Sequence, residues 1–504
     1  MGSVTLPLFG CPTAAGNIIE LNHPLIIGSG FGGSITAHRM TEQGIPVTLL
    51  ERGRRWPITP EGNTFCSMRE TDERAAWFSR SSHIGLTVRG LPLFAGIVEQ
   101  IVGDNIDINV GAGVGGGSLV YAGMMLQVPR NLFVSAFPAG ISYDDMLNTW
   151  YPKVASVMTM ARIPDDILQS PTYSAARTFI DHATRAGLDL EFNLQAVDWN
   201  LIREEMMGMR PAEATAGDYI YGLNSGAKGS VDQTYLAYAE RTGLCDVKPL
   251  HQVTRVASDL GGGYRVDCER IDEQGNVLER ITYRAPVLVM SAGAVHTTRM
   301  LVEARARGDM PNLPAQVGEG WGQNGQHIFM RGGLTEATGT AQGGPPFVVI
   351  RDLDNPIAPV TMEYGAAPFP LESHTLVCPV SSIQDGFGRI RYDAMLDRGV
   401  VEWDPASTAN ARMAGEHTGT RLNMAAGGMN QPLIGRRRES TFHPLGGCVI
   451  GSATDLFGRV NGMRGLYVLD GALMPGATPT CNPAWTISAI TERALDTILR
   501  EDFV

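Results

Sequence analysis

The sequence lacks long hydrophobic runs, paired cysteines and an excess of basic residues. No stretch of about 18 consecutive apolar residues occurs, so the sequence predicts no transmembrane helix. None of the seven cysteines belongs to a C-x-x-C pair, which argues against a zinc or iron–sulfur site and against a disulfide framework. The 40 Lys and Arg are outnumbered by 52 Asp and Glu, and a net charge of −12 disfavours binding to nucleic acid. We therefore expect no bound metal and no nucleic-acid partner.

An export signal and internal repeats are absent as well. The first residues, MGSVTLPLFGCPTAAGN, contain neither the basic stretch nor the apolar core of a signal peptide. An odd number of cysteines without close pairing fits a reducing compartment. We therefore expect a cytoplasmic protein, and a secreted mature form stays open as the alternative.

Glycine is the residue type in clear excess. The chain has 60 glycines, whereas an average usage of about 7% would give roughly 35. The excess has no period, which excludes collagen, and 43% apolar residues exclude a disordered chain. Glycine allows tight turns and a close approach of backbone to a ligand, so the excess is a first indication of a cofactor. A chain of this length is expected to form about three domains or one large two-lobed enzyme.

The most specific local pattern predicts a dinucleotide-binding unit near the N-terminus. An apolar strand leads into Gly28-x-Gly30-x-x-Gly33, a helical segment follows, and a second strand at 46–50 ends in Glu51. In such a βαβ unit the glycines allow a tight turn, a close approach to a pyrophosphate and close helix–strand packing. The acid after the second strand is placed to bind a ribose hydroxyl, which disfavours NADP.

Three later segments carry candidate site residues. The run 111–118 is too rich in glycine for packing alone, so we expect it to approach a ligand. His443 precedes a proline, which favours extended backbone, and a histidine taken by itself is more often structural than catalytic. Asn482 and Pro483 open the last helix, either as a plain cap or to direct the positive end of the helix at a cofactor.

Three further side chains near these motifs have ordinary interpretations. Cys448 and Cys481 adjoin the motifs, and we expect small buried side chains rather than nucleophiles. Glu363 alternates with apolar residues on a predicted strand, where a carboxylate is usually solvated. None of the three would be assigned to chemistry on local sequence alone.

The remaining pattern predicts how the chain is organised. Residues 145–185 predict amphipathic helix, and residues 328–405 alternate as antiparallel strands do. Short apolar strands of the kind found in nucleotide-binding sheets occur at the start, in the middle and at the end of the chain. We therefore expect an α/β protein with a discontinuous Rossmann-like cofactor domain and an inserted α+β substrate domain on a mostly antiparallel sheet. The expected cofactor domain covers 1–130, 245–320 and 441–504, and the expected substrate domain covers 131–244 and 321–440.

Taken together, these segments resemble the glucose–methanol–choline (GMC) oxidoreductases, and within them the bacterial cholesterol oxidases that bind FAD non-covalently. The resemblance runs along nearly the whole chain and is most specific in the C-terminal block. The stretches that carry it are 65–68, 113–120, 219–222, 234–237, 250–253, 317–325, 443–448, 458–460, 470–471 and 482–483.

The resemblance implies a non-covalent FAD site. The βαβ unit would bind ADP, the loop around Gly115 would lie along the flavin, Val253 near the adenine, and Asp470 near the ribityl chain. The residues implied to bind the cofactor are Gly28, Gly30, Phe31, Gly32, Gly33, Glu51, Arg52, Gly111, Gly115, Gly116, Ser118, Gly123, Met124, Val253, Gly293, Asp470, Gly471, Asn482 and Pro483.

The resemblance also implies three catalytic residues. His443 matches the active-site histidine that engages the substrate hydroxyl, and Asn482 matches the asparagine over the flavin edge. Glu363 matches a buried glutamate that moves protons on a steroid ring after oxidation.

The implied activity is oxidation of a secondary alcohol on a bulky hydrophobic substrate, first of all a 3β-hydroxysteroid such as cholesterol. Hydride would pass to flavin N5 and then to O2 or another acceptor, with or without Δ5 to Δ4 isomerisation. A sterol would imply transient contact with a membrane surface. The alternatives are a polyketide or terpenoid alcohol, a redox-neutral flavin-dependent isomerase or lyase, and a flavoprotein without catalysis. Oxidase against dehydrogenase and the oligomeric state stay open.

Two departures from the family pattern lie close to the implied flavin. Tyr121-Ala122 stands where the family has Asn-Gly, and the segment from Thr478 to Cys481 is one residue longer. A larger aromatic side chain at this place is expected to affect oxygen access or substrate fit.

Overall fold

The computed structural model describes residues 17–82, 84, 88–369, 371–432 and 438–503. The N-terminal residues on which the expectation about export rests, Cys11 among them, lie outside these ranges.

The short apolar strands predicted from the sequence form one parallel sheet, which β11 joins at its edge, in the order β11-β3-β2-β15-β25. Segments from the start, the middle and the end of the sequence therefore lie side by side, as the scattered strand signals predict. Four of the five strands are buried on both faces, which is why they are largely apolar without alternation, whereas the edge strand β11 is partly exposed and carries Asp246 and Lys248. Their bounds are β2 (Leu25–Ile27), β3 (Val47–Leu50), β11 (Cys245–Lys248), β15 (Leu288–Met290) and β25 (Leu466–Val468).

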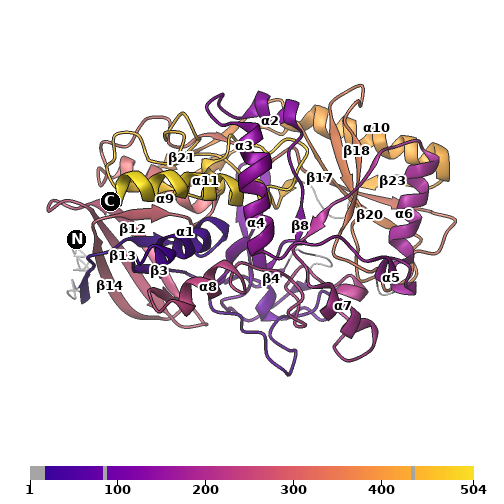
Figure 1. Cartoon of the computed structure of the whole chain (residues 1–504), viewed down its shortest axis with the longest axis horizontal. Helices are drawn as coiled ribbons and strands as arrows, with labels where there is room; N and C mark the ends of the chain where they lie inside the picture. The colour runs from indigo at the N-terminus through magenta and orange to yellow at the C-terminus, as the bar shows by residue number, and fades with distance from the viewer. Residues whose placement is uncertain (1–16, 83, 85–87, 370, 433–437, 504) are drawn as a thin grey trace, which may run out of the picture.

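The first helix, α1 (Phe31–Glu42), begins directly after β2, and glycine makes this tight connection. A Cβ atom at Gly33 would lie 1.9 Å from the carbonyl oxygen of Gly28, so any side chain there would push the helix off the sheet. On its outer side α1 packs against α8 (Tyr235–Arg241) and α11 (Ala484–Asp502) (Figure 1). The helix after Pro483 predicted from the sequence is α11.

A four-stranded sheet in the order β1-β14-β13-β12 flanks this unit near the N-terminus (Figure 1). The pairs within β12–β14 are antiparallel, and β1 joins in parallel. The helix α9 packs on β12 and on a three-stranded sheet, β16-β21-β22. The bounds are β1 (Asn17–Glu20), β12 (His251–Ser258), β13 (Tyr264–Ile271), β14 (Val277–Ala285), α9 (Ala294–Ala306), β16 (Glu319–Trp321), β21 (Gly388–Asp393) and β22 (Arg398–Glu402).

The other half of the molecule is built on an antiparallel sheet in the order β23-β17-β20-β19-β18-β9. Two helices, α6 and α10, pack on one face of it (Figure 1). The opposite face lines a cavity, and side chains alternate between the two faces along each strand. The bounds are β9 (Leu190–Phe192), β17 (His327–Gly332), β18 (Val348–Asp352), β19 (Val360–Glu363), β20 (Leu376–Ser382), β23 (Met429–Pro432), α6 (Ser174–Arg185) and α10 (Ala409–Ala426).

The single helix predicted over 145–185 is broken into several pieces in the structure. A helical stretch ends at Val157, and α6 starts only at Ser174. Pro164 and Pro171 lie between them. Inside a helix, proline has no N–H to donate and its ring clashes with the backbone of the preceding turn. The pieces are α3 (Tyr143–Asp145), a π-helical turn (Met146–Trp150), α4 (Tyr151–Val157), α5 (Asp165–Leu168) and a 3₁₀ turn (Pro171–Tyr173).

The remaining elements are short. A sheet in the order β24-β7-β6 lies beside the cavity, and β10 pairs with β8. These elements are β4 (Ser81–Ser82), β5 (Val88–Arg89), β6 (Val98–Val102), β7 (Ile106–Gly111), β8 (Met124–Met125), β10 (Leu194–Gln195), β24 (Glu439–Thr441), α2 (Arg130–Ala136), α7 (Trp199–Met206) and 3₁₀ turns at 73–75, 116–119, 214–216, 405–408 and 471–473.

Two large hydrophobic cores correspond to the two main sheets. The segment from Phe133 to Val154 belongs to the core of the parallel sheet, because α4 packs against α11. The sequence places this segment in the substrate domain, 131–244, so packing favours a later start for that domain. The division into two domains stays a prediction.

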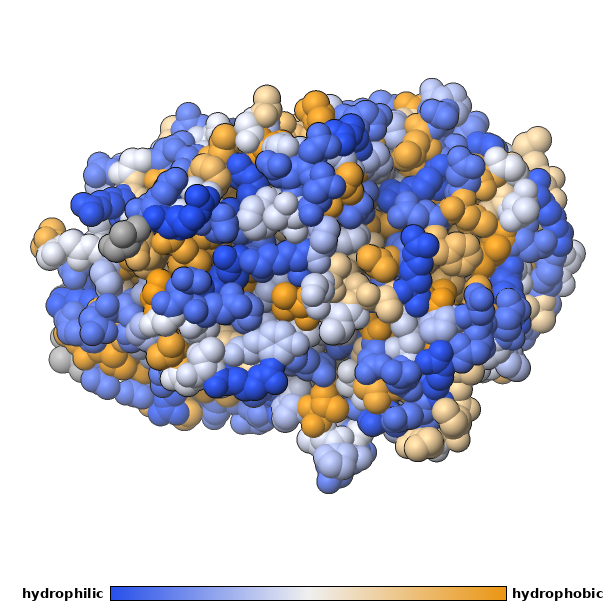
Figure 2. Space-filling view, in the orientation of Figure 1, coloured by the Kyte–Doolittle hydropathy of each residue, from blue (hydrophilic) through white to orange (hydrophobic). Residues whose placement is uncertain are grey.

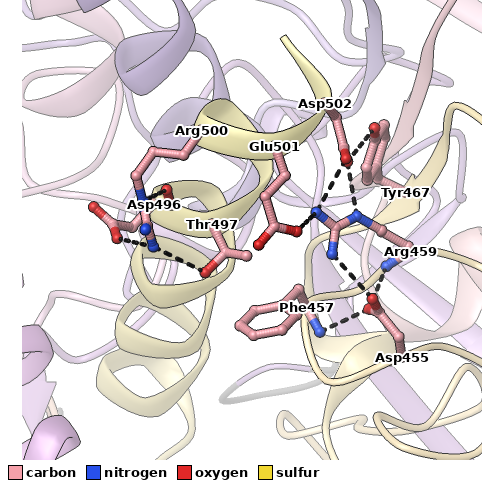
Figure 3. Close-up of polar contacts among 9 residues, drawn as sticks. All are labelled: Asp455, Phe457, Arg459, Tyr467, Asp496, Thr497, Arg500, Glu501 and Asp502. Atoms are coloured by element: carbon pink, nitrogen blue, oxygen red, sulfur yellow. Dashed lines mark hydrogen bonds and ion pairs between the residues drawn. The ribbon is translucent and has the colours of Figure 1, made fainter. Parts of the chain in front are cut away.

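Charged side chains hold the end of α11 against the loop after residue 455 (Figure 3). The guanidinium of Arg459 contacts Asp455 at 3.1 Å, Glu501 at 2.8 Å and Asp502 at 2.7 Å. The hydroxyl of Tyr467 also donates to Asp502, at 2.8 Å. This network ties the C-terminal helix to the strand β25.

Hydrophilic side chains are interspersed with apolar ones over the face shown in Figure 2. Within the described ranges, none of the helices combines the length and the apolar character that crossing a bilayer would require.

Candidate active site

One cavity of about 1540 Å³ runs between the parallel sheet and the antiparallel sheet. Residues that directly follow β2, β3, β15 and β25 line its first part, which is the carboxyl edge where open α/β sheets bind ligands. Ordinary small-molecule sites measure roughly 300–1,000 Å³, so this cavity has room for a cofactor and a second ligand.

The glycine loop after β2 and the acid after β3 form the first wall. Gly28, Gly30 and the start of α1 line the cavity, and the Cβ position of Gly30 faces open space. Glu51 is held in place because its carboxylate accepts from Ser29 N–H at 3.1 Å, Ser29 hydroxyl at 2.7 Å and Gly53 N–H at 2.8 Å. Backbone and a fixed acid therefore meet where the sequence predicts a nucleotide.

Asp470 plays a similar part on the opposite wall. Its carboxylate accepts from Gly293 N–H at 2.8 Å, Thr297 hydroxyl at 2.6 Å and Ala472 N–H at 2.7 Å. Burial raises the pKa of Asp470 to about 6, although these three donors oppose the shift. Asp470 thus anchors the start of α9 at the cavity rather than projecting freely into it.

A charged cluster beside this end was not predicted from the sequence. Arg52, a predicted cofactor residue, contacts Glu99 at 2.7 Å and lies over the ring of Trp77, and His296 contacts the same carboxylate at 2.7 Å. Burial alone would raise the pKa of Glu99, but the charges of Arg52 and His296 lower it well below its usual range. These residues match no local motif, so only the folded chain identifies the cluster.

The second glycine run brings backbone to the cavity beside the first. Gly111 and Gly116 line it, and a Cβ at Gly116 would lie 2.7 Å from the Cα of Gly30. The two glycine loops therefore touch. Tyr121 and Ala122 continue the wall, and the Tyr121 hydroxyl donates to a backbone carbonyl at 2.7 Å.

Four residues predicted to bind the cofactor do not line the cavity. The N–H of Gly115 donates to the Ser29 hydroxyl at 3.1 Å, and the hydroxyl of Ser118 accepts from a backbone N–H at 2.9 Å, both behind the wall. Gly33 and Gly123 also serve close packing. These four shape the site, whereas the following predicted residues do line it: Gly28, Gly30, Phe31, Gly32, Glu51, Arg52, Gly111, Gly116, Met124, Val253, Gly293, Asp470, Gly471, Asn482 and Pro483.

The three predicted catalytic residues come together in the same cavity. His443 follows β24, Glu363 ends β19, and Asn482 precedes α11. Enclosure by protein lowers the pKa of His443 to about 4. The side-chain oxygen Oδ1 of Asn482 is buried and has no hydrogen-bond partner among the described residues. This oxygen is therefore free to accept a hydrogen bond from a ligand bound in the cavity.

Glu363 is fully enclosed and titrates unlike a surface carboxylate. Burial raises its pKa to about 7, and hydrogen bonding by Asn482 and the charge of Arg351 only partly offset this. The carboxyl group can therefore both take up and release a proton near neutral pH. The expectation that a strand carboxylate is solvated is wrong here.

The remainder of the cavity is an apolar chamber. Tyr219 borders it near Glu363, whose negative charge adds to burial in raising the pKa of the phenol. The side chains that form the chamber are Met68, Ile84, Val120, Tyr219, Ile220, Ile328, Met330, Pro346, Ala366, Ala367, Pro368, Phe369, Val377, Pro379 and Phe442.

A buried lysine behind the wall was also missed. The ammonium of Lys228 donates to the carbonyl of Leu119 at 2.9 Å and to that of Tyr219 at 2.6 Å. Burial lowers the pKa of Lys228 to about 7. The lysine thus ties the second glycine run to the chamber wall, and no sequence signal indicated it.

A separate group of potential metal ligands lies away from this cavity. Asp181, His182 and Glu336 bring ligand atoms within 4.8 Å of one another. Arg185 pairs with both carboxylates, and Arg331 donates to Nδ1 of His182 at 3.2 Å. Side-chain cations already neutralise this group. Cys448 and Cys481 are buried, as expected, and do not line the cavity.

The residues present fit a flavin dinucleotide. Two glycine loops and the starts of two helices, α1 and α11, open on the cavity, and helix starts favour anionic groups. The orphaned Asn482 oxygen and the fixed Glu51 carboxylate offer acceptors at opposite ends. A long ligand with a phosphate centre and polar ends matches this arrangement.

Comparison with known proteins agrees with this assignment. The family model described as GMC oxidoreductase matches residues 393–491, and one described as an NAD(P)-binding Rossmann-like domain matches residues 26–57. A cholesterol oxidase of Acinetobacter baumannii is 24% identical, with 94% of each chain covered. A cholesterol oxidase of Mycobacterium tuberculosis is 26% identical, with 93% of this chain and 90% of the relative covered.

The solved structure of pyridoxine 4-oxidase from Mesorbium loti has the same fold. The TM-score is 0.65 at 16% identity, with 95% of this chain and 100% of that chain covered. The predicted α/β fold class is confirmed, as is the prediction of an FAD-dependent alcohol-oxidising enzyme. The chain thus carries a GMC oxidoreductase C-terminal domain and a Rossmann-like dinucleotide-binding domain, and along most of its length it is similar to cholesterol oxidases.

Proposed function

We propose that this enzyme oxidises a secondary alcohol on a bulky hydrophobic substrate, with a 3β-hydroxysteroid such as cholesterol as the first candidate. The observation that carries the proposal is that His443, Asn482 and Glu363 line the same cavity as the apolar side chains of the chamber. The chamber suits a hydrocarbon body, and the three polar residues suit one hydroxyl group. Two relatives named cholesterol oxidases support the substrate class.

The cofactor is proposed to be non-covalent FAD, held by the residues that line the first part of the cavity. Bound FAD supplies the hydride acceptor, and O2 or another oxidant would restore it. A sterol would reach the chamber through transient contact with a membrane surface.

His443 is proposed to engage the substrate hydroxyl. Because its pKa is about 4, the ring is neutral at physiological pH and can share a hydrogen bond with the alcohol oxygen. The start of α11 favours negative charge at this end of the cavity, which suits oxidation of the alcohol. Positioned acid–base groups of this kind contribute roughly 10²–10⁴-fold in rate.

Glu363 is proposed to move a proton in a second step. On a Δ5-3-ketone it would remove a proton from C4 and return one at C6, so that the double bond shifts into conjugation. A carboxyl group with a pKa of about 7 can do both near neutral pH. Glu363→Gln should leave alcohol oxidation largely intact and abolish the conjugated product, as measured by ultraviolet absorption of the enone.

The first experiment is anaerobic reduction of the purified holoenzyme by cholesterol, followed through the oxidised flavin absorption band. Rapid bleaching is expected, and cholest-5-ene, which lacks the hydroxyl, should cause none. Readmission of air then separates an oxidase, which recovers the band at once, from a dehydrogenase. An unchanged flavin spectrum with cholesterol would reject the sterol and direct the search to polyketide or terpenoid alcohols.

A further inference from the structure

We propose that Asn324 is a positioning residue that orients His443 and joins its loop to the loop carrying Asn482. The inference rests on the proposed role of His443 in alcohol oxidation. Asn324 is fully buried, lies outside the cavity and was not singled out among the candidate site residues. Its effect on substrate would therefore pass through His443.

One amide group makes both connections. Nδ2 of Asn324 lies 3.4 Å from Nδ1 of His443 and donates to the carbonyl oxygen of Cys481 at 2.7 Å. Cys481 immediately precedes Asn482, so a single NH2 group bridges the two segments that carry proposed catalytic side chains. Displacing Asn324 would loosen both segments at once.

The orientation of this amide follows from its other contacts. Its Oδ1 accepts from the N–H of Thr478 at 2.8 Å and from the Thr478 hydroxyl at 3.3 Å. An amide rotated by 180° would set its NH2 group against the Thr478 N–H and its oxygen against the Cys481 carbonyl. The donor side must therefore face His443.

The backbone at this position also favours asparagine. Asn324 has a φ of +67°, a left-handed conformation in which asparagine is several-fold enriched over most residues. Its N–H donates to Oε1 of Gln384 at 3.1 Å. Every polar group of Asn324 apart from its carbonyl thus has a defined partner, and the residue is held rigidly behind the histidine.

This geometry determines which ring nitrogen of His443 carries the proton. A donor facing Nδ1 favours the neutral tautomer with its proton on Nε2. No described residue is a hydrogen-bond partner of Nε2, and the ring borders the cavity. Asn324 therefore leaves His443 with an N–H directed at the substrate oxygen.

The decisive experiment is nitrogen NMR of the histidine-labelled holoenzyme, because it reports the tautomer without relying on turnover. The His443 signals are assigned by their loss in His443→Ala. We expect Nδ1 without a proton and Nε2 with one. Asn324→Asp presents an acceptor instead and should move the proton to Nδ1. A wild-type ring protonated on Nδ1 would overturn the inference without touching the proposed function.

Kinetics supply the second measurement. Asn324→Ala should lower kcat by about 10²-fold with little change in KM, which is the usual effect of a small misplacement near the reacting atoms. The matched control is Thr478→Val, which removes a hydroxyl from the same network but leaves the Asn324–His443 contact. Equal losses of kcat in both variants, with the tautomer unchanged, would reduce Asn324 to a structural residue.

The two hypotheses can fail separately. If His443→Ala retains turnover, the proposed function of His443 fails, whereas the tautomer shift in Asn324→Asp would still report the positioning contact.

Discussion

The two ends of the cavity are built on opposite principles. At the end proposed to bind the nucleotide, here called the nucleotide end, the charged groups have partners. Glu51 accepts three hydrogen bonds, and Glu99 forms ion pairs with Arg52 and His296. At the chamber end His443 and Glu363 sit among apolar side chains, and burial shifts both toward their neutral forms. One end keeps fixed charges for recognition, and the other keeps protons available for transfer.

The comparison predicts that substitutions at the two ends have separable effects. The largest effect is expected for His443→Ala, which should lower kcat by about 10²–10⁴-fold because the group that engages the hydroxyl is lost. FAD content, measured as the ratio of flavin to protein absorbance, should stay unchanged. With a pKa of about 4, the wild-type ring should cause no change of rate near pH 6.5. Loss of FAD from this variant would contradict the separation.

The second prediction concerns stability at the chamber end. The pKa of Glu363 is raised from 4.5 to about 7, so the folded state holds the proton more tightly than the unfolded state. Its contribution to the free energy of unfolding is complete below pH 4.5 and is lost as the pH rises to about 7. The loss is about 3 kcal/mol at most. Thermal unfolding of wild type and Glu363→Gln over this range should diverge, with the variant favoured at high pH.

The third prediction concerns Glu51 at the nucleotide end and contrasts with the first prediction, which concerns His443 at the chamber end. Glu51→Gln keeps the shape of the side chain but removes its negative charge. That charge accepts from Ser29 and Gly53 and is proposed to accept from a ribose hydroxyl of FAD. Because hydrogen bonds to charged groups contribute about 1.5–3 kcal/mol, FAD affinity should fall by about 10- to 100-fold. Flavin fluorescence during titration of apoprotein measures this fall. At saturating FAD, kcat of the variant should match that of wild type. A large drop in kcat would show that the effects of the two ends on binding and turnover are not separable.

The smallest effect sharpens the substrate class. Among the described residues, the hydroxyl of Tyr219 has no hydrogen-bond partner, and the side chain borders the chamber near Glu363. For a sterol with a single hydroxyl, Tyr219→Phe should change kcat/KM by less than about fivefold, since an unused hydroxyl contributes under 1 kcal/mol. A decrease of about 10²-fold with another alcohol would identify a substrate whose second oxygen binds the phenol.

Local sequence predicted those features that depend on backbone conformation within one segment. The spacing of Gly28, Gly30 and Gly33 after an apolar strand predicted the βαβ unit, because each glycine stands where a side chain would clash with nearby backbone or with a ligand. Glu51 followed from its place at the end of the next strand. Family resemblance then indicated His443 and Asn482, which the folded chain brings into one cavity.

Local pattern does not specify features that depend on packing between segments distant in the sequence. Gly115 and Ser118 lie in a glycine-rich run that reaches the cavity, yet their own groups turn to Ser29 and to the backbone behind it. Residues 145–185 have helical periodicity, but two prolines divide them. Periodicity does not report which side of a loop meets the ligand.

The sequence by itself determined the Rossmann-like unit and the antiparallel sheet, and its family resemblance supplied the candidate catalytic side chains. Only the tertiary structure decided their chemistry: that Glu363 is enclosed beside Asn482, that Glu99 joins Arg52 to His296, and that Asn324 stands behind His443. The reason is physical. Helix and strand formation depend on neighbours in the chain, whereas pKa values, tautomers and ion pairs depend on neighbours in space.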